Sequence, residues 1–165
     1  MTLNELNTDD RDAFVGALGW IVEESPWVAE RAWARRPFAT VDALHQALTA
    51  AIDDAGRDEQ LAILRAHPDL GARVRMSPVS TSEQSGAGLT ALSPAQRTRL
   101  LALTSAYRER FGFPFLFAVK GSTTEGIIAA LETRLTGSLE SEFAEALRQV
   151  HRIAWLRIVG TIGGL

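Results

Sequence analysis

The amino-acid sequence predicts an all-α protein without a sheet. Apolar residues recur at spacings of about three and four along most of the chain, and no stretch shows the alternation of an amphipathic strand. The 165 residues, 46% of them hydrophobic, are enough to bury a sizeable core. We therefore expect a single compact helical domain over residues 1–165, with about seven to nine helices.

Capping residues and prolines predict where the first helices begin and end. A side-chain oxygen at a helix start accepts a backbone N–H, and a proline disfavours helical backbone at the residue before it. Pro26 therefore suits the first turn of a helix, and Pro68 ends another. The predicted helices of this half run from Asp9 or Asp10 through Ile21, from Trp27 to about Arg35, from Thr40 through Ile52, and from about Arg57 to His67.

The second half of the chain is predicted in the same way. Ser80 and Glu83 form the Ser-x-x-Glu signature of a capping box, which predicts a short helix. The Ser-Pro pair at 93–94 opens a long helix, and the sequence FGFPF at 111–115 breaks it. The predicted helices of this half cover residues 80–89, Ser93 to Arg110, Thr123 or Thr124 through Leu135, and about Leu139 to Val159.

Charge and composition narrow the kind of partner. A net charge of −3 and a pI near 5.6 argue against a nucleic acid or an anionic membrane and favour a small molecule or a protein. The absence of cysteine suits a cytoplasmic setting. The longest apolar run, residues 113–119, is too short to span a bilayer, and the N-terminus lacks a signal-peptide pattern. The abundance of alanine and arginine suggests a bacterial source.

The last predicted helix carries a charged residue on its apolar face. Apolar residues from Phe143 to Ala154 form one stripe, and the next position on that stripe is Arg157. An inward guanidinium needs a carboxylate partner or an anionic or polar ligand, because burying an unpaired charge is costly. Alternatively, Arg157 reaches water near the helix end, where the helix dipole favours a positive charge. The sequence alone favours this second interpretation.

His67 also lies on the apolar face of its predicted helix. A neutral imidazole is usually satisfied within a core, but a histidine at a helix end is also well placed to transfer protons. No serine has the sequence context of a nucleophile elbow, so we predict no Ser-His-Asp triad, and Asp69 can simply shape the loop. His45 and His151 are not spaced with His67 like metal ligands, and we predict no zinc site.

Two further stretches have both a structural and a functional interpretation. A Ser-x-x-Glu signature usually means only a capping box, and Gly86 and Gly88 most often permit close helix packing. The phenylalanines at 111, 113, 115 and 117 would ordinarily be core residues. However, an aromatic coil with Pro114 offers backbone amides and carbonyls beside apolar walls, which suits a small polar heterocycle.

Four motifs in order resemble the 2-oxo-4-hydroxy-4-carboxy-5-ureidoimidazoline (OHCU) decarboxylases of urate breakdown. They are AHPDLG at 66–71, SxxEQxGAGL at 80–89, YxxRFGFPFLFAVKG at 107–121 and ALRQVHRIAWLR at 146–157. SPWVAERAW at 25–33 and RPFAT at 36–40 add to a likeness that spans nearly the whole chain. The resemblance implies an all-α, cofactor-free enzyme, usually a homodimer, that converts the unstable ureidoimidazoline acid to (S)-allantoin and CO2.

The resemblance also implies roles for individual residues. The family's catalytic histidine matches His67, and its substrate-binding Glu-Gln pair matches Glu83 and Gln84. No metal ligand is implied. The other positions that match substrate-binding residues are Pro68, Ser80, Arg157 and the backbone of Phe115, Leu116, Phe117 and Ala118. The sequence departs from the family in a shorter loop between His67 and Ser80 and in Thr104, where many members have Asn.

These assignments lead to a hypothesis for the chemistry. When CO2 leaves, its bonding electrons can flow into the conjugated ring system, so the reaction requires no metal. His67 would act as general acid or base, and Arg157 would supply fixed positive charge. Glu83 and Gln84 would accept from and donate to the ureido and ring N–H groups.

Two other functions are compatible with parts of the sequence. One is a non-catalytic dimeric interaction module, with Trp155 and Leu156 at the contact because they lie off the main apolar stripe. The other is a hydrolase or isomerase of a related ureido compound that uses the same pocket. A complex with the preceding enzymes of the urate pathway is a further hypothesis.

Overall fold

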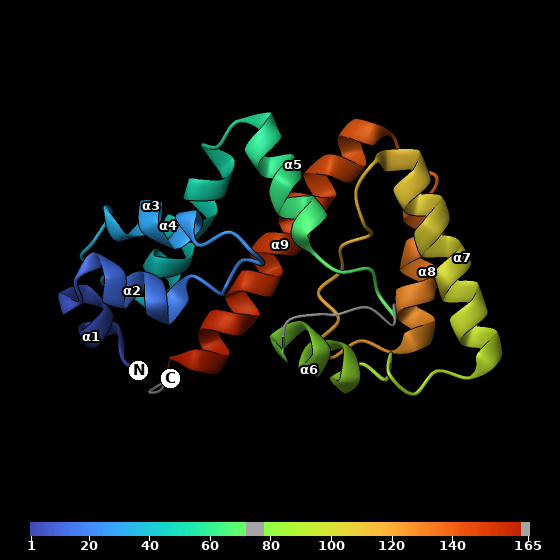
Figure 1. Ribbon diagram of the computed structural model, residues 1–165, viewed down its shortest axis with the longest axis horizontal. Helices are drawn as coiled ribbons and strands as arrows, with labels where there is room; N and C mark the ends of the chain where they lie inside the picture. The colour runs from blue at the N-terminus through green and yellow to red at the C-terminus, as the bar shows by residue number, and fades with distance from the viewer. Residues whose placement is uncertain (72–77, 163–165) are drawn as a thin grey trace. The chain divides into compact units, whose positions relative to one another are not determined.

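The protein is all-α, as predicted. The computed structural model describes residues 1–71 and 78–162, which contain nine α-helices and no strand (Figure 1). None of the helices in these ranges is long and apolar enough to cross a membrane. The helices are α1 (Leu3–Thr8), α2 (Arg11–Leu18), α3 (Trp27–Trp33), α4 (Val41–Asp53), α5 (Arg57–Ala66), α6 (Pro78–Gly86), α7 (Pro94–Phe111), α8 (Thr124–Arg134) and α9 (Leu139–Thr161).

The chain forms two compact units. The first unit contains Met1–Ile63 and the C-terminal part that begins at His151, and the second contains Leu64–Val150. The boundaries fall within α5 and α9, so each of these helices contributes residues to both units. The single domain that the sequence predicts over residues 1–165 stays a prediction.

Polar caps begin the helices of the first unit where the sequence predicts them. Asp10 accepts the N–H of Ala13 at the start of α2. Thr40 accepts the N–H of Ala43 at the start of α4. Each cap satisfies a backbone donor that has no partner within its own helix.

Two helices of the first unit are shorter than predicted, and one was not predicted. α2 ends at Leu18, and the indole N–H of Trp20 donates to the carbonyl of Ala17, at 2.8 Å, which satisfies one of the last carbonyls of the helix. α3 ends at Trp33. α1 was not predicted, although Thr2 and Glu5 begin it with a capping box.

Arg36 fixes the end of α1 to the segment that follows α3. Its guanidinium donates to the backbone carbonyls of Asn7 and Asp9, which lie at the C-terminal end of α1. The same group lies 4.3 Å from the centre of the Trp33 ring. One cation therefore satisfies carbonyls that no helical N–H reaches and also covers an aromatic face.

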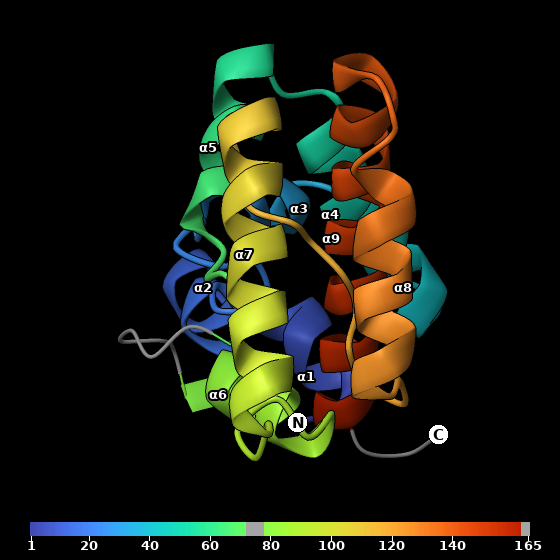
Figure 2. The ribbon, with the colours of Figure 1, turned by 90° about the vertical axis from the view of Figure 1, so that its right-hand side faces the viewer.

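In the second unit, α7 and α8 lie side by side (Figures 1 and 2). Ser93 and Gln96 form a capping box at the start of α7. Gly112 ends that helix with a φ of +79°, a left-handed conformation that glycine adopts at little cost. Thr123 accepts the N–H of Gly126 and begins α8. The predicted limits of both helices are therefore confirmed at these caps.

Between α7 and α8 the chain is extended and largely buried. After Gly112 it runs back alongside both helices (Figure 2). Phe113 and Phe115 are each 1% exposed and pack edge-on against Tyr107. The predicted helix break is confirmed. Phe117 differs from the other phenylalanines of this stretch because it is half-buried.

The contacts of Arg36 predict a large loss of stability when its guanidinium is removed. We expect Arg36→Met to lower the free energy of unfolding by about 2–3 kcal/mol, because hydrogen bonds from a charged donor are lost. Urea denaturation followed by circular dichroism measures this change. The neighbouring Arg35 pairs with Asp54 on the surface, so Arg35→Met should change stability by no more than about 1 kcal/mol. Equal effects of the two changes would contradict the role given to Arg36.

Candidate active site

His67 follows the last turn of α5 and is buried. Only 5% of its surface is exposed, and Ile63 and Leu64, on the same helix face, are fully buried. α5 ends at Ala66, one residue earlier than predicted, and the N–H of His67 makes a final turn contact with the carbonyl of Leu64 at 3.4 Å. The prediction that His67 faces inward at a helix end is confirmed.

The turn that follows His67 is held by side chains of two other helices. Arg108 of α7 pairs with Asp69 at 3.1 Å, and Arg97 of α7 donates to the carbonyl of Gly71 at 2.9 Å. The N–H of Gly71 donates to Oε1 of Gln84 in α6, at 2.9 Å. Asp69 therefore shapes the loop, as predicted.

Gly71 is needed at its position for two reasons. Its φ is +71°, and a Cβ built on it would lie 2.7 Å from Cδ2 of Leu100.

The hydrogen bond from Gly71 also defines the orientation of the Gln84 amide. The N–H of Gly71 can only donate, so the Gln84 atom that accepts from it must be the oxygen. The Nε2 donor is therefore at the other side of that amide group. Gln84 therefore both closes the turn and presents a defined amide orientation.

α6 does not begin with the predicted capping box. It starts at Pro78, so Ser80 lies within the first turn of the helix and is not its N-cap. The sequence prediction was wrong because proline is itself favoured at the first helical position, where its missing N–H costs nothing. Ser80 and Gln84, one helical turn apart, are 5% and 4% exposed, whereas Glu83 is half-buried.

The two glycines near the end of α6 have different environments. A Cβ at Gly86 would meet no atom within 4 Å. The predicted reason for this glycine, close helix packing, is therefore wrong. Gly88 has a φ of +78°, and it follows the end of the helix. Its left-handed backbone lets the N–H of Leu89 reach the carbonyl of Gln84 at 3.0 Å.

The extended segment after α7 relies on side chains for its backbone hydrogen bonds. Arg134 of α8 donates from Nη1 to the carbonyl of Leu116, at 2.6 Å. The N–H of Ala118 donates to Oε1 of Gln149 in α9, at 2.9 Å. Leu116 and Ala118 are buried, where an unpaired backbone group would be costly. No sequence signal marks Arg134 as a site residue, and Gln149 stands out only as part of the motif ALRQVHRIAWLR at 146–157.

Phe117 lies between these two anchored groups. Each peptide unit is planar and trans, so its N–H and its C=O point in opposite directions. The N–H of Phe117 therefore points away from the Arg134 contact, and its C=O points away from the Gln149 contact. Neither group bonds to any residue that the structure describes. Phe117 thus offers one donor and one acceptor beside aromatic rings, as its sequence context predicts.

The second unit contains every predicted site residue except Arg157. One hydrogen bond, from Nε of Arg65 to the carbonyl of Gly112 at 3.0 Å, connects the end of α5 with the start of the extended segment. The bond between Gly71 and Gln84 connects α6 with the turn after His67. The His67 turn, α6 and the extended segment are therefore joined by direct contacts.

Arg157 belongs to the first unit and is buried there. Its side chain is 2% exposed, Nη1 donates to the carbonyl of Ile21 at 3.1 Å, and Nη2 lies 3.3 Å from Oε1 of Glu23. The interpretation that Arg157 reaches water, which the sequence alone favours, is therefore wrong. The alternative, a buried guanidinium with a carboxylate partner, is confirmed.

The two other histidines lie together in the first unit. Nε2 of His45 is 2.9 Å from the carbonyl of His151, and Nε2 of His151 is 3.2 Å from Asp53. Burial lowers the pKa of His151, although the neighbouring Asp53 opposes this shift. His45 also packs edge-on against Trp155, with ring centres 5.3 Å apart. These contacts give both imidazoles a packing role.

The two departures from the family pattern have different outcomes. The hydroxyl of Thr104 donates to the carbonyl of Leu101 in its own helix, at 3.1 Å, so this buried side chain is satisfied without a partner elsewhere. The shorter loop between His67 and Ser80 includes residues 72–77, which lie outside the described residues.

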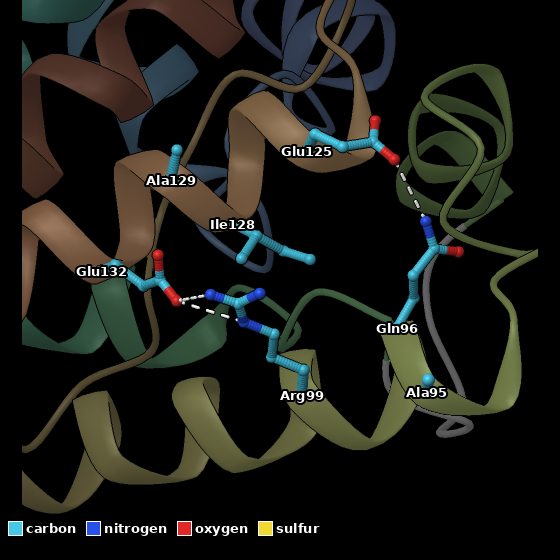
Figure 3. A pocket seen from close by; sticks show the side chains of 7 residues that line it. All are labelled: Ala95, Gln96, Arg99, Glu125, Ile128, Ala129 and Glu132. Carbon is cyan, nitrogen blue, oxygen red and sulfur yellow. Dashed lines mark hydrogen bonds and ion pairs between the residues drawn. The ribbon is translucent and has the colours of Figure 1, made fainter.

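A surface pocket of about 410 Å³ lies between α7 and α8 (Figure 3). Its volume is typical of a small-molecule site. However, its polar side chains bond to one another, Arg99 to Glu132 and Gln96 to Glu125, on either side of the apolar side chain of Ile128. None of the predicted site residues lines it. We therefore interpret these pairs as cross-links between two helices.

Comparisons with known proteins agree with this arrangement. A 2-oxo-4-hydroxy-4-carboxy-5-ureidoimidazoline decarboxylase of Haloferax volcanii is 50% identical over 158 residues, which cover 96% of this chain and 94% of that protein. The uric acid degradation bifunctional protein PucL of Bacillus subtilis is 41% identical and matches 98% of this chain, but only 33% of its own length is covered.

A solved structure is similar over nearly the whole chain. The crystal structure of (S)-allantoin synthase matches with a TM-score of 0.80 at 33% identity, covering 98% of this chain and 54% of that chain. The family model described as OHCU decarboxylase matches residues 7–159. With its buried helix-terminal histidine and its four ordered motifs, this chain belongs to the OHCU decarboxylase family.

Proposed function

We propose that this chain decarboxylates 2-oxo-4-hydroxy-4-carboxy-5-ureidoimidazoline to (S)-allantoin and CO2 in urate degradation, without a cofactor. The observation that carries this proposal is the placement of His67, a buried imidazole at a helix end, next to a turn that Arg108 and Gln84 hold through Asp69 and Gly71. Such a residue can transfer a proton at a fixed position. Membership of the family supplies the substrate class.

In the proposed reaction, the bond between the ring carbon and its carboxylate breaks and CO2 leaves. The electron pair enters the conjugated C=N system of the ring, and the ring nitrogen gains a proton. The hydroxyl-bearing carbon then loses its hydroxyl proton and becomes a carbonyl, and the neighbouring carbon gains a proton to give allantoin. His67 takes the hydroxyl proton or delivers the new one, and general acid–base catalysis of this kind contributes ~10²–10⁴-fold in rate. Protonation from one face gives the S enantiomer.

The other proposed substrate ligands supply complementary hydrogen bonds and charge. Glu83 accepts from ureido or ring N–H groups, and Gln84 donates from the amide end opposite its bond to Gly71. The backbone N–H and C=O of Phe117 match an amide-like edge of the ring. Ser80 and Pro68 contact the substrate in this proposal. Arg157 provides positive charge for the substrate carboxylate or for a carbonyl oxygen.

We further propose that the protein is a cytoplasmic homodimer that works beside other enzymes of urate breakdown. The Bacillus subtilis relative is described as a bifunctional protein of uric acid degradation, and this chain matches about a third of it. A second activity is therefore present on the same chain in that relative. This supports an association with pathway enzymes for the present chain.

The decisive experiment uses substrate made in situ. Urate is converted by the two preceding enzymes, and allantoin formation is followed by circular dichroism with and without this protein. We expect faster formation of the S enantiomer when the protein is present. A racemic product at the spontaneous rate in both samples would refute the proposed function.

Replacing the imidazole tests the catalytic role of His67. We expect His67→Asn to lose roughly 10²–10⁴-fold in kcat, because asparagine keeps a hydrogen-bonding side chain but cannot exchange protons near neutral pH. The thermal midpoint and the affinity for (S)-allantoin, measured by calorimetry, should change little. His45→Asn, in the other unit, is the matched control. A stereoselective His67→Asn variant with normal turnover would remove His67 from the mechanism.

A change at Glu83 tests its role in substrate binding, because α6 begins at Pro78 and Glu83 is not part of a capping box there. We expect Glu83→Gln to lower kcat/KM by at least about tenfold, since a charged acceptor of substrate N–H groups is lost. The free energy of unfolding should stay within about 0.5 kcal/mol of the wild type. Glu109→Gln, an exposed position on α7, serves as the control. A loss of stability with normal kinetics would instead mean that Glu83 supports the helix.

A further inference from the structure

Arg134, the last residue of α8, contacts several groups of the second unit. Its Nε donates to Glu142 at 2.8 Å, and its Nη2 donates to the hydroxyl oxygen of Tyr107 at 3.2 Å. Its Nη1 donates to the carbonyl of Leu116 at 2.6 Å. The guanidinium also lies 4.6 Å from the centre of the Phe115 ring. The contacts with Leu116 and Phe115 are therefore with the segment proposed to bind substrate.

The partners of Arg134 fix the direction of its guanidinium. The side chains of Arg134 and Glu142 are 11% and 7% exposed, so the charge of each is compensated chiefly by the other. Burial, together with the hydrogen bond to Glu142, raises the pKa of Tyr107, so the phenol keeps its proton and donates to Glu142 at 2.6 Å. A planar guanidinium held at Nε and Nη2 must aim Nη1 in one direction.

Gln149 holds the neighbouring peptide unit in a similar way. Its Nε2 donates to Glu145 at 2.7 Å while its Oε1 accepts from the N–H of Ala118. Burial opposes ionisation of Glu145, but hydrogen bonds from Gln149 and Arg148 outweigh it and lower the pKa of this carboxyl. An ionised Glu145 can only accept, so it orients the Gln149 amide with its oxygen toward Ala118.

We propose that Arg134, assisted by Gln149, is a positioning residue for the decarboxylation, and this inference rests on the function proposed above. By holding the carbonyl of Leu116 and the N–H of Ala118, the two side chains fix the peptide planes on either side of Phe117. The directions of the Phe117 N–H and C=O follow from those planes. Arg134 and Gln149 thus determine where the backbone donor and acceptor meet the substrate ring without touching it themselves.

Kinetics distinguish a positioning role from a purely structural one. If Arg134 and Glu142 only stabilised the fold, removing both would lower stability without changing kcat or KM of the folded protein. The test variant is Arg134→Met with Glu142→Leu, which removes both charges together and so avoids leaving one buried without compensation. The matched control is Arg99→Met with Glu132→Leu, which removes the ion pair between α7 and α8 (Figure 3). Neither of these two residues bonds to a described residue of the extended segment.

The readouts are the thermal midpoint, kcat and KM for (S)-allantoin formation, and hydrogen exchange of the amides at 115–118. We expect the Arg134→Met/Glu142→Leu variant to fold, to exchange faster at these amides and to lose roughly 10–100-fold in kcat/KM, the effect of a small misplacement of binding groups. Arg134→Lys should recover part of this loss. The control pair should keep wild-type kinetics.

A folded Arg134→Met/Glu142→Leu variant with wild-type kcat and KM would overturn the proposal, as would unchanged exchange at 115–118. If that variant does not fold, Gln149→Met is the deciding variant, because it removes the acceptor of the Ala118 N–H and the donor to Glu145 but leaves the buried ion pair of Arg134 and Glu142 intact. Reduced kcat/KM with a normal thermal midpoint supports positioning, and normal kinetics overturns it. If the wild-type chain itself forms no excess of (S)-allantoin, the proposed function is refuted. The exchange rates of the amides at 115–118 then still show whether Arg134 and Gln149 hold the extended segment in place.

Discussion

Buried backbone outside the helices needs hydrogen-bond partners, and this constraint organises the second unit. A helix pairs its own N–H and C=O groups, but the turn after His67 and the segment at 113–119 cannot do so. In the absence of a sheet edge among the described residues, helix side chains provide the partners. Gln84 and Arg97 form hydrogen bonds with the backbone of the turn, and Arg134 and Gln149 form hydrogen bonds with the backbone of the extended segment.

This arrangement makes irregular backbone rigid where binding and catalysis need it. A coil held by several charged or amide side chains can present backbone donors and acceptors at defined positions, as a helix or strand cannot, because its own groups are already paired. The half-buried Phe117 shows the result, since both flanking peptide units are fixed while its own polar groups make no bond to the described residues.

The two units use buried arginines in the same way. Arg157 binds the carbonyl of Ile21 and pairs with Glu23, and Arg134 binds the carbonyl of Leu116 and pairs with Glu142. In each case a carboxylate compensates the charge, and the planar guanidinium also satisfies a backbone oxygen. A lysine has a single nitrogen and could not hold both partners with the same geometry.

The sequence by itself determined the fold class, most helix limits and the family. These depend on local preferences, such as the caps at Thr40, Ser93 and Thr123, and on four motifs read together. Local signals failed where two of them competed. Thr2 and Glu5 form a capping box that was overlooked, whereas the same signature at Ser80 gave way to Pro78 two residues earlier.

Only the tertiary structure decided how the site residues are supported. The sequence could not predict three of the supporting contacts. They are the pair of Arg157 with Glu23, the bond of Gln84 to Gly71 and the bond of Arg134 to the carbonyl of Leu116. Each of these contacts joins segments well separated along the chain, and their meeting depends on how the helices pack. Spacing within one helix shows which face a residue occupies, but it carries no information about the atom that lies opposite.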